Sequence, residues 1–481
     1  MGSTIRFILD GELVELNDVD PTRTVLQYLR EDLRRVGSKE GCAEGDCGAC
    51  TVVVAEKVVG ADGVNLRAIN SCIQFLPTLH GKELITVESL QTNGADLHPV
   101  QQAMVDCHGS QCGFCTPGFV MSLFALYESH DNPSRTEIDD ALAGNLCRCT
   151  GYRPIIDAAI AMYDLPAVTH AAVHAEQLEA LDADDALHIE FGQRTFFAPV
   201  TSAELSTLLA KHADATILAG GTDVGLWVTK QQRVLDTIIY TGRVADLGKI
   251  DESDTHIEIG AAVTLTDAMQ VVVANYPQLD ELFRRFASPP IRNAGTLGGN
   301  IANGSPIGDS MAALMVAGST LILRSLDGDR EITLEDFYID YQVKDLRPGE
   351  FVAAVRMPKP KENTILRSYK LSKRFDQDIS AVCTAHRLEL RDGKVVDFAM
   401  ACGGLAATIK RASNCESALI GAEWNAASIE LAMQALSDDF APIDDMRASA
   451  DYRLRATQNL LQRFYLDSIG EFEQTVYNYG R

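Results

Sequence analysis

The chain has 481 residues, and its 67 acidic against 42 basic residues give a formal net charge of −25. This length predicts about three domains, and the negative charge argues against nucleic acids and anionic membranes as partners. No apolar run is long enough to span a membrane. The amino terminus begins as a strand rather than a signal peptide, and Arg6 stands where a myristoylation signal requires Ser or Thr.

Residues 1–90 predict a small ferredoxin-like unit made of a sheet, one helix and a cysteine loop. Two alternating stretches, Ile5–Leu9 and Glu12–Leu16, flank Asp10-Gly11, which predicts a hairpin. Residues 24–33 have helical periodicity. After the cysteine loop come a strand from Thr51 to Val54 and a second hairpin-like piece.

The cysteine loop has the spacing of a plant-type [2Fe–2S] site. Cys42, Cys47 and Cys50 form C-x4-C-x2-C, and Cys72 follows at a distance. The glycines between them allow positive φ angles and bring amide donors close to sulfur. A structural zinc site is the alternative, and this spacing favours the cluster.

A second group consists of two cysteine pairs, Cys112 with Cys115 and Cys147 with Cys149. Four converging thiolates hold either zinc or an iron–sulfur cluster, and the first group makes two clusters in series the better interpretation. Eight of the twelve cysteines then have metal-ligand spacing, which favours a reducing, cytosolic setting. The other four, Cys107, Cys383, Cys402 and Cys415, are interpreted as structural thiols.

Three helices are predicted around the second group, within a helical unit of residues 91–165. Thr116 is expected to cap the first, with Pro117 at its first position. Ser134 and Glu137 fit a capping box, and Pro154 opens the third helix. Both pairs therefore stand at helix entrances, where backbone N–H groups can donate to sulfur.

Residues 166–190 lack core periodicity and are interpreted as a linker, and strands alternate with helices over residues 191–363. An apolar strand ends at Leu218 and breaks into Gly220-Gly221, a turn whose amides can face an anion such as pyrophosphate. A second glycine-rich loop covers residues 286–300 and is followed by Ser305–Asp309. Two such loops suit a dinucleotide, but no G-x-G-x-x-G opens a helix after a strand, so a Rossmann nicotinamide site is not supported.

The last part, residues 364–481, predicts strands near Ser380–Leu390 and Val395–Ala401. Two or three helices are expected between Ala426 and Phe472. Nothing in this part indicates catalysis by itself.

The cysteine loops, the Ile217–Asp223 stretch and the Thr296–Ile301 stretch together resemble known motifs. The chain resembles the small, iron–sulfur and flavin subunit of bacterial xanthine dehydrogenases, in the molybdenum hydroxylase family, over nearly its whole length. The resemblance implies an α+β multidomain fold. Its parts would be a β-grasp [2Fe–2S] ferredoxin-like domain, a helical-bundle [2Fe–2S] domain, an α+β FAD-binding domain of the PCMH or vanillyl-alcohol-oxidase-like type, and a C-terminal α+β flavoprotein domain.

The resemblance also implies a role for individual residues. One cluster, nearer the flavin, would be ligated by Cys42, Cys47, Cys50 and Cys72, and one nearer molybdenum by Cys112, Cys115, Cys147 and Cys149. Gln111 matches a glutamine that touches the pterin of the molybdenum cofactor. The implied FAD contacts are Ile217, Leu218, Ala219, Gly220, Gly221, Thr222, Asp223, Val224, Phe286, Thr296, Gly299, Asn300, Asp309 and Lys370. For Phe286 a place in the core, and for Lys370 an exposed surface position, are the alternatives.

The implied activity is electron transfer within a cytoplasmic xanthine dehydrogenase of purine catabolism, with no catalytic residue for substrate oxidation on this chain. Electrons from molybdenum, on a large partner subunit in an α2β2 heterotetramer, would pass through two clusters to FAD and then to NAD+. The segment 371–381 matches a loop that tunes NAD+ against oxygen but departs in its charges at Phe375, so oxygen remains an alternative acceptor. Other possibilities are a subunit of a related enzyme that acts on an aldehyde, carbon monoxide or another N-heterocycle, and a stand-alone redox carrier, against which Gln111 argues. We expect the flavin part to fold separately from the cluster parts.

Overall fold

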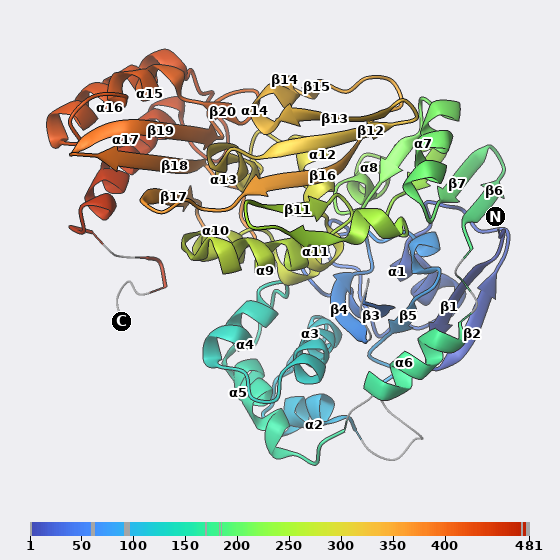
Figure 1. Ribbon diagram of the computed structural model, residues 1–481. Coiled ribbons are helices and arrows are strands. Elements are labelled where there is room, and N and C mark those ends of the chain that lie inside the picture. The colour runs from blue at the N-terminus through green and yellow to red at the C-terminus, as the bar shows by residue number, and fades with distance from the viewer. Residues whose placement is uncertain are drawn as a thin grey trace. The chain divides into compact units, whose positions relative to one another are not determined.

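The computed structural model describes residues 2–58, 63–90, 97–168, 171–181, 183, 185–472 and 475–477. The chain forms two compact units (Figure 1). Unit 1 contains Met1–Lys249, Thr264–Thr266 and Ser288–Thr296, and unit 2 contains Ile250–Val263, Asp267–Ala287 and Leu297–Arg481.

Unit 1 begins with a five-stranded sheet in the order β2-β1-β5-β3-β4. The strands are β1 (Ile5–Leu9), β2 (Glu12–Leu16), β3 (Thr51–Lys57), β4 (Val64–Asn70) and β5 (Glu83–Ile85). The predicted first hairpin is confirmed, with Ile5 opposite Leu16 and Leu9 opposite Glu12. The predicted helix is also present, as α1 (Val25–Gln27) running into a π-helical turn, Tyr28–Asp32. Thr24 begins it through a capping box with Gln27.

The second cysteine group belongs to a bundle of four helices, α2 (Pro99–Asp106), α3 (Thr116–Ser129), α4 (Arg135–Leu142) and α5 (Arg153–Ala161). The capping box of Ser134 and Glu137 before α4 is confirmed, and Pro154 lies in the first turn of α5. The predicted cap at Thr116 is wrong. Helix α3 is entered one residue earlier, at Cys115, and the Thr116 hydroxyl donates to Ser110 Oγ at 2.8 Å instead.

The stretch interpreted as a linker contains helix α6 (Ala171–Ala180). His174 Nδ1 of this helix lies 2.7 Å from Glu83 Oε2 of β5, and both side chains are buried. Leu178 is part of the same apolar core as α2, α3 and α5. This stretch is therefore packed against the ferredoxin-like sheet, a contact that its composition did not predict.

A second sheet of unit 1 has the order β6-β7-β9-β8. Its strands are β6 (Leu187–Phe191), β7 (Arg194–Ala198), β8 (Thr216–Leu218) and β9 (Thr237–Tyr240). Three helices accompany it, α7 (Ser202–Lys211), α8 (Val224–Thr229) and α11 (Pro289–Ala294). Strand β8 runs parallel to β9. The chain leaves β8 at Leu218 and makes its glycine turn directly after this strand.

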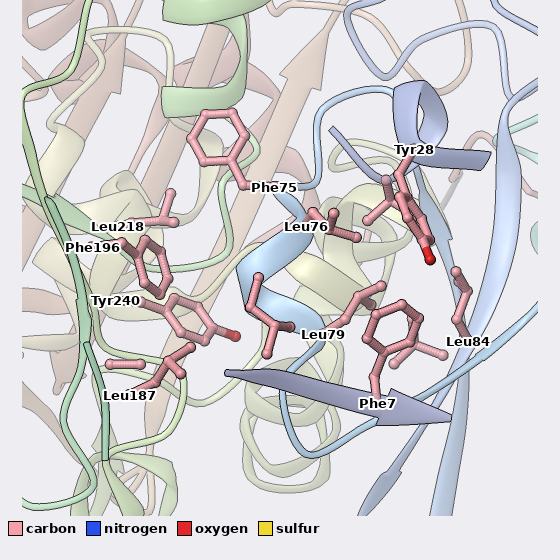
Figure 2. Packing of buried hydrophobic residues seen from close by; sticks show 14 of the residues in the cluster. Phe7, Tyr28, Phe75, Leu76, Leu79, Leu84, Leu187, Phe196, Leu218 and Tyr240 are labelled. Carbon is pink, nitrogen blue, oxygen red and sulfur yellow. The ribbon is translucent and has the colours of Figure 1, made fainter. Parts of the chain in front are cut away.

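One apolar core is shared by the two sheets of unit 1. Figure 2 shows Leu76 and Leu79 between Phe7 and Tyr28 on one side and the Phe196–Tyr240 pair of the second sheet on the other. Leu76 and Phe196 are fully buried. The expectation that the flavin part folds separately is therefore wrong for its first half, because removing the ferredoxin-like sheet would expose this core to water.

Unit 2 contains a five-stranded sheet and a four-stranded sheet, in the orders β10-β11-β16-β12-β13 and β17-β18-β19-β20, and a short hairpin β14-β15. The strands of the larger sheet are β10 (Ile250–Glu252), β11 (His256–Gly260), β12 (Thr320–Ser325), β13 (Gly328–Thr333) and β16 (Phe351–Pro358). The hairpin is β14 (Tyr338–Asp340) with β15 (Val343–Lys344). The helices of this part are α9 (Leu265–Asn275), α10 (Asp280–Arg284), α12 (Leu297–Asn303), α13 (Asp309–Ala317) and α14 (Leu334–Phe337).

The carboxyl-terminal sheet consists of β17 (Thr364–Leu371), β18 (Val382–Arg391), β19 (Lys394–Gly403) and β20 (Lys410–Arg411). Helices α15 (Ser413–Leu419), α16 (Ala426–Asp439) and α17 (Ala450–Ser468) pack on it (Figure 1). Phe398 of β19 and Phe464 of α17 meet in this core. The strands and the two helices predicted here are confirmed. Among the described residues, no helix has the length and apolarity needed to cross a membrane.

Because the two sheets of unit 1 share one core, a cavity in this core should destabilise both sheets together. Leu76→Ala should lower the free energy of unfolding of unit 1 by about 2 to 5 kcal/mol. The change should also shift the unfolding transition reported by Trp227, which packs against this core from α8. Urea denaturation followed by fluorescence in a Trp424→Phe background measures this, because the chain has 2 tryptophans.

Leu13→Ala is the matched control, since Leu13 is 58% exposed on β2 and should change stability by less than about 0.5 kcal/mol. A Trp227 transition that stays at its original midpoint in Leu76→Ala would show that the two sheets fold independently.

Buried His386 of β18 predicts acid lability of unit 2. The ring stacks on Phe464, and burial lowers its pKa from 6.5 to about 3. Below pH 6.5 the His386 ring binds a proton in the unfolded chain, whereas in the folded chain it stays neutral down to about pH 3. Stability should therefore be complete above pH 6.5 and fall toward pH 3, by up to about 1.4 kcal/mol per pH unit from this residue. Replacing His386 by Leu should flatten the plot of unfolding free energy against pH between 6 and 4, followed through Trp424. An unchanged slope would contradict the assignment.

Candidate functional site

The β3–β4 hairpin brings the first cysteine group together. Cys50 directly precedes β3, and Cys72 follows β4 by two residues. Because Thr51 pairs with Asn70 across the hairpin, these cysteines come from adjacent strand ends, and the Ser71 N–H donates to the Cys50 carbonyl. Both thiols are buried, whereas Cys42 and Cys47 are partly exposed on the loop.

The backbone of this loop is turned toward sulfur. The N–H groups of Glu44, Asp46 and Cys47 each lie 3.4 Å from Cys42 Sγ. Thiols of Cys47 and Cys72, together with these amides, hold the pKa of the Cys42 thiol well below its usual value. Such a nest of donors around a thiolate is what an anionic iron–sulfur cluster needs, so these residues fit a [2Fe–2S] group.

Cysteines of the second group lie on the loops before α3 and α5. Cys112 and Cys149 are exposed, and Cys115 and Cys147 are partly exposed. The Phe114 amide and the Cys149 thiol lower the pKa of Cys112, whereas burial raises that of Cys115 to about 12. The Thr150 hydroxyl lies 3.1 Å from Cys147 Sγ. The thiols interact in two pairs, Cys112 with Cys149 and Cys115 with Cys147, and two pairs of thiols fit the two irons of a second cluster.

Among the described residues, no group of three or more His, Cys, Asp or Glu side chains is arranged to hold a single metal ion. A [2Fe–2S] cluster does not require such a group, because each of its two irons takes two protein ligands.

The two cysteine loops contact each other directly. The Leu146 N–H donates to the Cys47 carbonyl at 3.0 Å, which joins the residue before Cys147 to a cysteine of the other group. Buried Asn145 supports this contact, because its amide nitrogen lies 3.1 Å from the Gly48 carbonyl and 3.2 Å from Thr51 Oγ1. A β-carbon at Gly118 would lie 2.0 Å from the Gly48 oxygen, so only glycine permits this approach. Asn145 stands in the cysteine motif that carries the resemblance, but its role in joining the two loops was not predicted from the sequence.

Exposed apolar and polar side chains lie around the second cysteine group. Phe114 is 46% and Leu146 45% exposed, and Gln111 and Arg148 are exposed beside them. Gln111 therefore lies next to the exposed thiol of Cys112 rather than in a core.

Unit 1 brings the first glycine turn against part of the second glycine loop. A β-carbon at Gly220 would lie 1.9 Å from the Ala294 carbonyl oxygen, and one at Gly295 would lie 3.2 Å from Thr222 Oγ1. Gly221 has a φ of +76°. Leu218 is buried, Ile217 and Asp223 are exposed, and Ala219, Thr222 and Val224 are partly exposed. Thr296 forms an isolated bridge with Thr264.

The amides of this turn are available to a ligand. Among the described residues, the N–H groups of Gly220, Gly221, Thr222 and Asp223 donate to no carbonyl or side chain. Consecutive free amides on a glycine turn form an anion-binding concavity, so this turn fits a pyrophosphate.

The other predicted flavin residues belong to unit 2. Buried Lys370 of β17 donates from Nζ to Asp309 Oδ2 at 2.6 Å, and the Ser380 hydroxyl donates to Asp309 Oδ1 at 2.5 Å. Asn300 Oδ1 accepts from Ser310 Oγ at 2.7 Å. The alternative of an exposed Lys370 is therefore wrong, and Ser380 is a polar partner that the sequence did not single out. Phe286 and Gly299 are partly exposed, so Phe286 is not fully enclosed in a core.

Arg285, a buried residue at the carboxyl-terminal end of α10, binds the segment that follows Lys370. Arg285 donates to the carbonyls of Lys370 and Phe375 at 3.1 and 3.0 Å. Its guanidinium also lies 5.6 Å from the centre of the Phe375 ring. The Phe375 ring therefore makes a cation–π contact with an arginine of its own unit.

Four known families match successive parts of the chain. Residues 7–73 match a 2Fe-2S iron-sulfur cluster binding domain, and residues 86–160 match a [2Fe-2S] binding domain. Residues 189–360 match the FAD binding domain in molybdopterin dehydrogenase. Residues 367–468 match the CO dehydrogenase flavoprotein C-terminal domain. The predicted fold class is thereby confirmed.

Individual relatives are similar over different shares of their length. A xanthine dehydrogenase of Emericella nidulans is 33% identical over 98% of this chain and 39% of its own length. Aldehyde oxidase 1 of Bos taurus is 30% identical over 97% of this chain and 39% of its own length. The chain thus spans about two fifths of these relatives.

A solved structure, the reconstituted CO dehydrogenase from Oligotropha carboxidovorans, is 28% identical. It covers 55% of this chain and 94% of its own chain, with a TM-score of 0.52. The four domain matches give the order of the parts along the chain: two [2Fe-2S] domains, an FAD binding domain of molybdopterin dehydrogenases and a CO dehydrogenase flavoprotein C-terminal domain.

Proposed function

We propose that this chain is the electron-transfer subunit of a xanthine dehydrogenase. The observation that carries the proposal is the contact of two cysteine loops within one unit, beside a turn of free amides that fits a pyrophosphate. A series of carriers must be close to each other, and the Leu146–Cys47 hydrogen bond holds the loops in contact.

Each cysteine group would hold one [2Fe–2S] cluster, with Cys42, Cys47, Cys50 and Cys72 as ligands of one and Cys112, Cys115, Cys147 and Cys149 as ligands of the other. In unit 1, the amides of Gly220–Asp223 and the side chain of Thr296 would contact FAD. In unit 2, the FAD contacts that the resemblance implies are Phe286, Asn300, Asp309 and Lys370. When bound, the clusters carry single electrons, and FAD collects them as a pair for NAD+. Because Asp309 is already neutralised by Lys370, this pair presents no net charge to a flavin.

The exposed surface of Gln111, Phe114 and Leu146 would face the partner that holds the molybdenum cofactor. Aromatic side chains are enriched in the cores of protein–protein interfaces, and Phe114 is such a side chain beside the exposed cysteine group. This partner would be a large subunit, in a two-fold α2β2 assembly, because two-fold closure is the commonest symmetry of oligomers.

Xanthine, rather than an aldehyde or another N-heterocycle, is the proposed substrate of the complex. The xanthine dehydrogenase relative has both cluster parts and the flavin part in one chain, as this chain does. The CO dehydrogenase structure, in contrast, covers only 55% of this chain, although nearly all of its own length is matched. NAD+ as acceptor, a cytoplasmic location and a role in purine catabolism complete the proposal, with an aldehyde oxidase subunit as the alternative.

Native purification with metal analysis tests the assignment. Eight cysteine ligands predict about four irons and one FAD per chain. A large second chain should copurify and account for the molybdenum. Stoichiometric zinc, or only two irons, would contradict the two-cluster assignment, and xanthine oxidation by the isolated chain would contradict the division of labour.

Two serine substitutions test the order of the carriers. Cys115→Ser and Cys47→Ser should each reduce xanthine-dependent NAD+ reduction to background, because a linear series has no parallel route. NADH should still reduce FAD and an artificial dye, since neither residue belongs to the shared core of unit 1. The measurement is rapid mixing with xanthine followed by spectra, after FAD content has been checked. Cys107→Ser, at a partly exposed thiol outside both groups, is the matched control. FAD reduction by xanthine at the wild-type rate in Cys47→Ser, with the second cluster intact, would overturn this order.

A further inference from the structure

Helix α8, which follows the free-amide turn, packs against the first cysteine loop. A β-carbon at Gly225 would lie 2.5 Å from the Ile73 carbonyl oxygen, so the helix backbone approaches the residue after Cys72 closely. Leu226 of α8 and Ile291 of α11 pack on a small apolar cluster that contains Cys50 and Cys72. The flavin part of unit 1 therefore forms one wall around these thiols.

One hydrogen bond connects α8 to the loop itself. The Thr229 hydroxyl lies 2.8 Å from the Ala43 carbonyl oxygen, across 186 positions of sequence. It also lies 3.1 Å from the carbonyl of Gly225, one turn earlier in its own helix. A hydroxyl has one proton, and the shorter distance favours Ala43 as its acceptor.

The Ala43 carbonyl and the Glu44 N–H belong to one planar peptide group, so the direction of one determines the direction of the other. At its N–H end, this peptide donates to Cys42 Sγ at 3.4 Å. Thr229 thus holds the carbonyl end of a peptide whose opposite end faces a cysteine sulfur. A carbonyl that accepts a hydrogen bond also polarises its peptide and strengthens the N–H as a donor.

The conformation of Ala43 requires such support. Its φ of +55° lies in the left-handed region, which costs a residue with a β-carbon about 1 kcal/mol or more. Lys230 and Glu44 add an ion pair at 3.5 Å between the same two segments, but both side chains are exposed and the pair is weak. The partly buried hydroxyl contact, at 2.8 Å, is therefore the specific one.

We propose that Thr229 is a positioning residue for the first cluster, which it reaches through the peptide of Ala43 and Glu44. The inference rests on the proposed function, since it takes Cys42, Cys47, Cys50 and Cys72 as ligands of that cluster. Donors to a ligand sulfur stabilise the more negative, reduced state of a cluster and raise its reduction potential. The hydroxyl of Thr229 therefore keeps this potential higher than the loop alone would.

The test compares three variants of the full chain purified with its partner. Thr229→Val removes the hydroxyl with little change of shape, and Thr229→Ser keeps it. Thr207→Val is the matched control, because Thr207 donates to the Ala203 carbonyl of its own helix at 2.8 Å and is exposed on α7, away from both cysteine groups. Redox titration followed by electron paramagnetic resonance gives the potential and the signal of each cluster. Iron and FAD contents are measured on the same samples.

In Thr229→Val the first cluster should have a lower potential and an altered signal, while the second cluster stays unchanged as an internal reference. Thr229→Ser and Thr207→Val should match the wild type. Should Thr229→Val not load the first cluster, loading with a wild-type signal in Thr229→Ser supports the proposal. An unchanged first cluster in Thr229→Val, or equal changes in the Val and Ser variants, would overturn it. Absence of [2Fe–2S] signals in the wild-type chain would instead refute the proposed function.

Discussion

The apolar core shared by the two sheets of unit 1 is the constraint on which both of its candidate sites depend. Leu76 and Leu79 follow Cys72 by a few residues, and their side chains pack between the ferredoxin-like sheet and the strands that end at the glycine turn. A displacement of either sheet would move Cys72 and Leu218 together. Because protein interiors are close-packed, such a core transmits strain rather than absorbing it.

Close backbone approach completes the arrangement that this core begins. Gly48 meets Gly118, Gly220 meets Ala294 and Gly225 meets Ile73, and in each place a β-carbon would overlap a carbonyl oxygen. These contacts join the first cysteine loop to the second and to the flavin turn. These glycines therefore allow close backbone contacts as well as turns. Asn145 donates hydrogen bonds to polar groups that these contacts bury.

In unit 2 the main constraint is a buried ion pair. Lys370 and Asp309 are both buried, and a buried ion pair is costly unless further hydrogen bonds satisfy it. Ser380 supplies such a bond to the second carboxylate oxygen. The three side chains come from β17, the start of α13 and the end of the segment that Arg285 holds, so this one cluster ties three parts of the unit together.

The sequence by itself determined the local features of this protein. The Asp10-Gly11 hairpin, the Ser134 capping box, the helix opened at Pro154 and the cysteine spacings all depend on residues a few positions apart, whose preferences act through the adjacent backbone. Tertiary structure alone decided the features that join distant segments. Thr116 lost its expected cap because the chain entered α3 a residue early, and Lys370 proved buried because Asp309 lies beside it. The shared core and the bond from Thr229 to Ala43 connect residues more than a hundred positions apart, and no spacing or propensity in one chain specifies which distant surface a side chain will meet.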